Sequence, residues 1–240
     1  MTISKPWVFA TKQVPECDIC SNQLFSVRHP HITSLSGLGA TEGRASLLLG
    51  SSTLHNVWLS HNYRPQVHTY HDCIIGGQVH DCHASFLHQL AGWTGRLDVV
   101  LACGVNNVST RDSACDIIFQ LKSLVGSIKF QNPKNNIVIS SLLYAPKYCD
   151  ASLPSSKNML HKVREVNRWI EQFNMKETGL VLDLGLRGVV GDPMEGSFIV
   201  HRYQDWREQV KEKKLHLQQR LKDDIARELG QVFSGMRELG

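Results

Sequence analysis

The chain has 240 residues, of which 42% are hydrophobic and 20% are charged, as is usual for a globular protein with one large domain or a domain and an extension. Its formal net charge of +4 is too small to imply nucleic-acid binding alone, and no apolar run reaches the roughly 18 residues of a membrane-spanning helix. The first 20 residues lack the apolar segment of a signal peptide, and the seven cysteines follow no disulfide pattern. We therefore expect an intracellular protein with reduced thiols.

The first part of the chain, residues 1–44, shows little hydrophobic periodicity and contains three prolines and the glycine-rich stretch SLSGLGATEG. We expect an irregular extension there and a domain at 45–240. Cys17 and Cys20 form a Cys-x-x-Cys pair that could hold zinc, but the histidines downstream are irregularly spaced for a structural zinc site. We expect no cofactor and no metal, with this pair as a weak candidate.

Short apolar runs alternate with amphipathic segments through the rest of the chain. The apolar runs predict strands at 45–50, 67–75, 97–103, 136–143 and 179–185. The amphipathic segments predict helices at 52–61, 79–93, 111–128, 155–174 and 217–233. We expect the helix at 79–93 to turn Phe86, Leu87 and Leu90 inward.

This alternation is typical of a parallel sheet with helices on both faces. Right-handed crossovers then give a three-layer α/β/α sandwich with a mostly parallel, about five-stranded sheet of the flavodoxin-like kind. Ligand sites in such sheets lie beyond the carboxyl ends of the strands. The residues that follow each apolar run are therefore the candidates for function.

Those strand-end segments bring together the residue types of an acyl-transfer site. They are GSSTL at 50–54, IIGGQVHD at 74–81 and ACGVNNVST at 102–110, with KKLHLQQR at 213–220 before the last helix. A serine hydroxyl becomes nucleophilic when a histidine accepts its proton. The oxyanion that then forms needs fixed donors, which a glycine turn and an asparagine amide can supply.

On these segments the sequence resembles the SGNH, or GDSL-type, hydrolases. The resemblance implies that Ser52 in GSS is the nucleophile and that His216 in KKLH is the base. It also implies an oxyanion hole formed by the Ser52 N–H, the N–H of a glycine at Gly76 or Gly77, for which we favour Gly77, and the amide of Asn106 in GVNN. The expected substrate is a small ester.

Three positions depart from the pattern of that family. Ser51 stands where the family has an aspartate before the nucleophile, and Asn107 stands where it has an aspartate after the oxyanion asparagine. Lys213 replaces the aspartate that orients the histidine and stabilises the imidazolium. A weakened hydrolase and a catalytically inactive module both remain open.

An inactive module of this fold would bind RNA or a protein partner, as the resemblance implies for the germ-plasm organiser Oskar and for esterase-type domains of some retrotransposon proteins. A basic strip formed by Lys211, Lys213, Lys214 and Arg220 could then contact nucleic acid.

Each candidate also has a structural interpretation. Ser51 and Ser52 could cap the helix that follows them. Asn106 and Asn107 could have been selected as turn formers, and His216 could be a surface residue of an amphipathic helix. The order of the four segments along the chain favours the functional interpretation.

Overall fold

The computed structural model of the chain describes residues 43–51, 69–74, 76–89, 93–142, 154–182, 189–190, 199–200 and 219–240. All of these residues lie in the second of the two units into which the chain divides, Met1–Thr33 and Ser34–Gly240. The fold is therefore that of the second unit.

A parallel sheet in the order β2-β1-β3-β4 forms the centre of the described part. Its strands are β1 (Arg44–Ser51), β2 (Thr69–Ile74), β3 (Arg96–Ala102) and β4 (Asn136–Ile139). The chain passes from β1 to β2 on one side and then to β3 on the other, so the strand order reverses at β1. Such a reversal leaves a crevice at the carboxyl ends of β1 and β3.

The fifth predicted strand, at 179–185, is reduced in the described residues to one parallel bridge between Ser140 and Leu182. One reason is that α4 (Pro154–Glu177) already covers the backbone along this edge of β4. The amide of Asn174 accepts from the Ile139 N–H at 2.9 Å and donates to the Ile139 carbonyl at 2.7 Å. These bonds occupy peptide groups that a longer strand would use.

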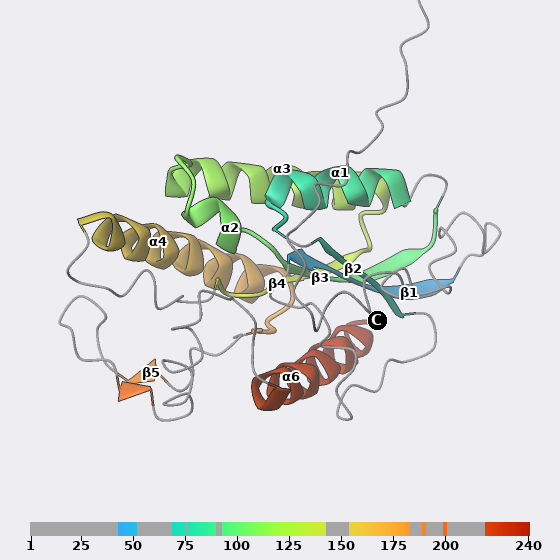
Figure 1. Cartoon of the computed structure of the whole chain (residues 1–240). Helices are drawn as coiled ribbons and strands as arrows, with labels where there is room; N and C mark the ends of the chain where they lie inside the picture. The colour runs from blue at the N-terminus through green and yellow to red at the C-terminus, as the bar shows by residue number, and fades with distance from the viewer. Residues whose placement is uncertain are drawn as a thin grey trace, which may run out of the picture. The chain divides into compact units, whose positions relative to one another are not determined.

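Besides α4, the helices of the described part are α1 (Val79–Gln89), α2 (Val105–Val108), α3 (Ala114–Gln131) and α6 (Gln219–Glu238). Two short antiparallel strands, β5 (Val189–Val190) and β6 (Ile199–Val200), form a separate two-stranded sheet. Helices α1, α3 and α4 cover one face of the main sheet and α6 covers the other (Figure 1). The expected three-layer α/β/α sandwich is confirmed.

Alternate strand residues supply the two cores. Leu47, Leu49, Val99 and Leu101 pack under α1, α3 and α4, whereas Leu48, Val100 and Val138 pack on α6. Successive side chains of a strand point to opposite faces, so continuous apolar runs such as LLL produce both contacts.

The prediction for Leu87 was wrong, because this side chain is 57% exposed. The buried residues of α1 are Val79, Cys82 and Phe86, which share one face at a spacing of three and four residues. Leu87 follows Phe86 directly and is rotated by about 100° around the helix axis.

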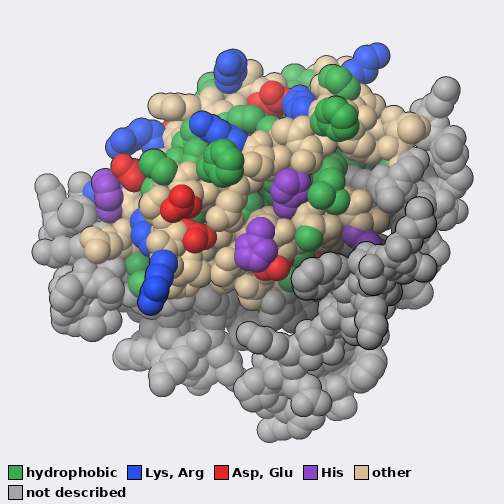
Figure 2. Space-filling view, turned by 90° about the horizontal axis from the view of Figure 1, so that it is seen from above, with side chains coloured by type: hydrophobic (Ala, Val, Ile, Leu, Met, Phe, Trp, Pro, Cys, Tyr) green, Lys and Arg blue, Asp and Glu red, His purple; other side chains and the backbone are tan. Residues whose placement is uncertain are grey.

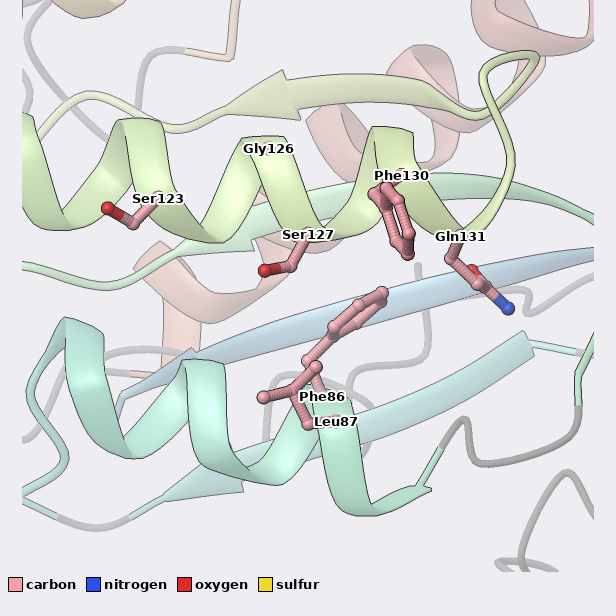
Figure 3. A pocket seen from close by; sticks show the side chains of 7 residues that line it. All are labelled: Phe86, Leu87, Ser123, Gly126, Ser127, Phe130 and Gln131. Carbon is pink, nitrogen blue, oxygen red and sulfur yellow. The ribbon is translucent and has the colours of Figure 1, made fainter.

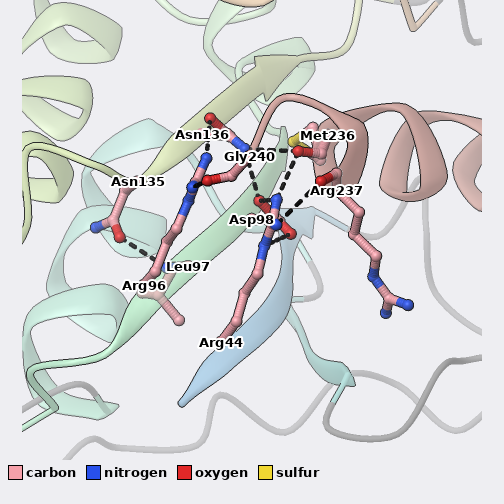
Figure 4. Close-up of polar contacts among 9 residues, drawn as sticks. All are labelled: Arg44, Arg96, Leu97, Asp98, Asn135, Asn136, Met236, Arg237 and Gly240. Atoms are coloured by element: carbon pink, nitrogen blue, oxygen red, sulfur yellow. Dashed lines mark hydrogen bonds and ion pairs between the residues drawn. The ribbon is translucent and has the colours of Figure 1, made fainter. Parts of the chain in front are cut away.

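At the amino ends of the strands, polar side chains hold the carboxyl end of α6 (Figure 4). The fully buried Asp98 accepts from Arg44 Nε at 2.8 Å and from Asn136 Nδ2 at 2.8 Å. Arg44 also donates to the carbonyls of Met236 and Arg237, and Asn136 donates to the carbonyl of Met236. Cationic and amide donors thus satisfy carbonyls that the last turn of a helix leaves unpaired.

The outer face of the layer formed by α1 and α3 carries hydrophobic side chains between basic ones (Figure 2). Phe119 and Phe130 of α3 are 70% and 92% exposed. Among the described helices, none has the length and apolarity that a membrane crossing requires.

Candidate functional site

Two of the four predicted catalytic-site residues, Gly77 and Asn106, belong to the described part of the chain. The other two, Ser52 and His216, lie outside the described residues, as does Lys213. Several candidates for metal or nucleic-acid binding also lie outside them: Cys17, Cys20, Lys211 and Lys214. The backbone of Arg220 belongs to α6, but its side chain is outside the description, so RNA binding stays a prediction.

Gly77 lies in the tight turn between β2 and α1. Its N–H donates to the Ile74 carbonyl at 3.0 Å. A Cβ atom at this position would come within 2.8 Å of the Ile74 Cβ, closer than such atoms approach in real proteins. Close packing of the turn therefore requires glycine here.

The turn after β3 brings Asn106 to the same end of the sheet. Gly104 has a φ angle of +108°, in the region that favours glycine, and a Cβ atom there would lie 3.2 Å from Leu142. The Gly104 carbonyl then accepts from the Asn107 N–H at 3.1 Å and starts the single turn of α2. This sharp turn sets the direction of the chain after β3 and therefore the position of Asn106.

The two predicted oxyanion-hole residues are in direct contact, although 29 residues separate them in the sequence. Asn106 Nδ2 donates to the Gly77 carbonyl oxygen at 2.9 Å. The two expected oxyanion donors, the Asn106 amide and the Gly77 N–H, thus both have partners within the protein, because the Gly77 N–H donates to the Ile74 carbonyl. An amide nitrogen carries two hydrogens, and the bond to Gly77 uses one of them.

Asn107, next to Asn106, makes contacts that the sequence did not predict. It is fully buried, and its Oδ1 accepts from the Val79 N–H at 3.0 Å. Its Nδ2 donates to Asp112 at 2.8 Å and to Gln120 at 3.1 Å. The adjacent asparagines therefore hold the two ends of the segment from Gly77 to Val79. The motif position was the only sequence signal, because Asp112 and Gln120 belong to no motif.

Ser51 is the last residue of β1 and is fully buried. Its Oγ lies 3.5 Å from the carbonyl oxygen of Ala102, the last residue of β3. The strand that leads to Ser52 and the strand that leads to Asn106 are thus neighbours up to their final residues.

Two cysteines near the carboxyl ends of the strands, Cys73 and Cys82, have the properties of structural thiols. Burial, with a smaller contribution from Asp72, raises the pKa of the Cys73 thiol above its ordinary range. A hydrogen bond with Cys103, followed by burial, raises the pKa of Cys82 in the same direction. A thiol with a raised pKa forms little thiolate, so these residues are poor nucleophiles at neutral pH.

A separate hollow of about 460 Å³ lies between α1 and α3 (Figure 3). It is lined by Phe86, Leu87, Ser123, Gly126, Ser127, Phe130 and Gln131. None of the predicted site residues lines it. Within the described ranges, no three or more histidine, cysteine or acidic residues are grouped as a metal site would require.

Solved structures with this arrangement include several hydrolases. A GDSL-like lipase from Bacteroides thetaiotaomicron VPI-5482 matches with a TM-score of 0.59 and 14% identity, over 85% of this chain and 94% of that chain. The chain has the SGNH hydrolase fold. A member of the lipolytic G-D-S-L family from Veillonella parvula DSM 2008 has a TM-score of 0.53 and 14% identity, over 80% of this chain and 99% of that chain.

An acetyl xylan esterase, AlAXEase, matches with a TM-score of 0.52 and 11% identity, over 79% of this chain and 98% of that chain. No protein-family model matches the sequence, and a search of curated proteins finds no match. At these identities the SGNH likeness concerns the fold, and the chemistry must be argued from the residues.

Proposed function

We propose that the protein is a serine esterase of the SGNH type that hydrolyses small esters. Ser52 attacks the ester carbonyl, and His216 accepts the serine proton and later donates it to the leaving alcohol. Water then hydrolyses the acyl-enzyme with His216 as the base. The Asn106 amide is the main donor to the oxyanion, with the backbone N–H groups of Ser52 and Gly77 as further donors.

The observation that carries this proposal is the contact between Asn106 and the Gly77 turn beside the end of β1. It joins two of the three backbone turns that the resemblance assigns to the site, at the crevice where the strand order reverses. Ser52, the next residue after β1, belongs to the third. We assign Asn106 the larger role because its amide keeps a second hydrogen, whereas the single hydrogen of the Gly77 N–H is already donated to the Ile74 carbonyl.

Small acyl groups are the favoured substrates. The sequence contains no long hydrophobic segment that would serve as a lid over a long acyl chain. The acetyl xylan esterase among the solved structures acts, by its name, on an acetyl ester. Acetate and butyrate esters are therefore the first substrates to test.

Lys213 should weaken the reaction. A cation near an imidazole disfavours the protonated form that His216 must adopt as the serine loses its proton. Replacing the orienting aspartate costs about 10⁴-fold in rate in the well-studied serine protease triad. On this proposal, Lys213→Asp restores the missing partner and raises kcat by about tenfold or more.

The test is hydrolysis of p-nitrophenyl acetate and butyrate by the wild type and the variants Ser52→Ala, His216→Ala and Asn106→Ala. The first two should abolish turnover, and Asn106→Ala should lower kcat by about 10²-fold while the protein stays folded. Lys214→Asp is the matched control for Lys213→Asp. A wild-type rate that neither Ser52→Ala nor His216→Ala changes, or fluorophosphonate labelling at a residue other than Ser52, would refute the assignment.

A further inference from the structure

Asn107 has a buried side chain, and its surroundings require one of its polar atoms to accept a hydrogen bond and the other to donate. The Oδ1 acceptor faces the Val79 N–H at the first turn of α1. The Nδ2 donor faces two acceptors, Asp112 Oδ2 just before α3 and Gln120 Oε1 in the second turn of α3. A side chain at this position therefore has to accept in one direction and donate in the other.

An aspartate at position 107 would not meet these requirements beside the present neighbours. It could accept from Val79, but its second oxygen would face the Asp112 carboxylate at about the 2.8 Å that now separates Asn107 from Asp112. Two ionised carboxylates this close repel each other, so residue 107 could donate only while one of the two keeps a proton and would lose that donor as the pH rises. A leucine would leave the buried Val79 N–H without an acceptor, which destabilises the fold.

Hydrogen bonds with Thr110 and Gln120 hold Asp112 in place opposite Asn107. The Thr110 N–H and hydroxyl both donate to the Asn107 carbonyl, at 3.0 and 2.6 Å. The Asp112 N–H in turn donates to the Thr110 hydroxyl at 3.2 Å. Gln120 Nε2 donates to the same carboxylate oxygen at 3.3 Å. The acid at 112 is thus held by the turn that also holds residue 107.

We propose that Asn107 is a positioning residue for the oxyanion hole and that Asp112 is its fixed partner. The pair sets the distance between the turn after β3 and the first turn of α1, and so holds the Asn106 amide against the Gly77 carbonyl. The acid that the SGNH pattern places at 107 stands at 112 in this chain, and the amide has taken position 107. The inference rests on the proposed function.

Exchanging the two groups tests the pair. Asn107→Asp should lower kcat for p-nitrophenyl acetate by about tenfold or more at pH 8, with little change in KM, because the oxyanion donor acts in the transition state. The double variant Asn107→Asp/Asp112→Asn should recover most of the rate, since the Gln120 amide can flip to donate to the new carboxylate at position 107 and accept from the new amide at position 112. Glu171→Gln, on the exposed face of α4, is the control for a carboxyl-to-amide change.

The pH profile separates positioning from a general loss of structure. The Asn107→Asp variant should regain activity relative to the wild type as the pH falls, because protonation of one carboxyl restores a donor. Other charged or titratable groups on these elements include His80, Asp81 and His83 of α1, Arg111 beside Asp112, Asp116 and Lys122 of α3, and Lys162 of α4, which donates to the Thr110 carbonyl. They are the same in all variants, so the difference between profiles reports on positions 107 and 112.

Amide hydrogen exchange at Val79 gives a readout that needs no substrate. At pH 8, exchange should be faster in Asn107→Asp than in the wild type, because repulsion from Asp112 moves residue 107 away from the Val79 N–H, and it should be slow again in the double variant. If the wild type hydrolyses no ester, the proposed function fails, and the exchange pattern still decides whether the pair holds the turn. The inference would be overturned if Asn107→Asp kept the kcat and the Val79 exchange rate of the wild type. It would also be overturned if the single and double variants lost kcat equally.

Discussion

At both ends of the parallel strands, side chains form the missing hydrogen bonds of a helix end, but with opposite chemistry. We call these two ends of the sheet the carboxyl edge and the amino edge. At the carboxyl edge, the neutral amide of Asn107 accepts from the first turn of α1. At the amino edge, Arg44 and Asn136 donate to the last carbonyls of α6, and Arg44 is paired with the buried Asp98. Each helix end has the partner that its unpaired groups and its dipole require.

The difference separates stability from activity. The amino edge joins β1, β3 and β4 to α6 through a buried charge, and neither Gly77 nor Asn106, the two described candidates, makes a contact in that network. The carboxyl edge holds Asn106 of α2 against Gly77 through a hydrogen bond of 2.9 Å between two uncharged groups. Changes at the first edge should therefore reduce folding, and changes at the second should reduce catalysis more than folding.

The largest effect on stability is expected for Asp98→Ala. The variant removes the partner of Arg44, whose side chain is 29% exposed, so the loss falls at the lower end for a broken buried ion pair, at about 3 kcal/mol in the free energy of unfolding. Urea denaturation measures this, with the exposed Glu238→Ala as the control. Esterase activity per folded molecule should be unchanged, and a loss of activity without a loss of stability would erase the distinction between the edges.

A smaller loss of stability is expected for Gly104→Ala at the carboxyl edge. The φ angle of +108° disfavours any other residue, and the new methyl group would press on Leu142, for a cost of about 2 kcal/mol. Because Gly104 starts the turn that carries Asn106, kcat should fall further than the lost folded fraction explains.

The matched glycine is Gly126, an exposed residue of α3 with open space around its Cα. Gly126→Ala should stabilise the protein by about 0.5–1 kcal/mol through helix propensity and leave kcat unchanged. Equal kcat values for the two alanine variants, after correction for folding, would show that the Gly104 turn does not position Asn106.

Much of this arrangement could be predicted, because it depends on local patterns. The apolar runs gave four strands that the structure contains, and the amphipathic segments gave α1, α3, α4 and α6. Differences arose where contacts distant in sequence decide: Asn174 covers the edge at Ile139, where a longer fifth strand was expected. The difference at the start of α3 is local instead, because the capping box of Ser113 and Asp116 begins this helix at Ala114, three residues later than predicted.

The candidate site shows the same division. GVNN and the glycine pair predicted that Asn106 and Gly77 lie at one end of the sheet, and the structure shows them in contact there, while their catalytic roles stay predictions. The role of Asn107 could not be predicted, because it depends on a side-chain network with Asp112 and Gln120 that no sequence periodicity encodes.

The smallest effect concerns α1 beyond its first turn, at His83. Its Nε2 lies 2.7 Å from Ser127 Oγ of α3, and burial lowers the pKa of His83 below its ordinary value. The folded protein therefore favours the neutral imidazole. Its contribution to stability is fully present above the unfolded pKa of about 6.5 and is lost as the pH falls through the folded value.

The stability of the wild type should thus fall relative to His83→Gln as the pH decreases from about 7 to 5. Urea denaturation across this range measures the free energy of unfolding of both proteins. The contributions of the other histidines cancel in the difference between the two. Ser127→Ala keeps most of the burial and should keep the slope, since desolvation is the cause of the shift. Because His83 packs α1 on α3 away from the carboxyl edge, the pH dependence of stability should change in His83→Gln while kcat does not. Parallel stability curves for the wild type and His83→Gln would show that α1 gains no pH dependence from this residue.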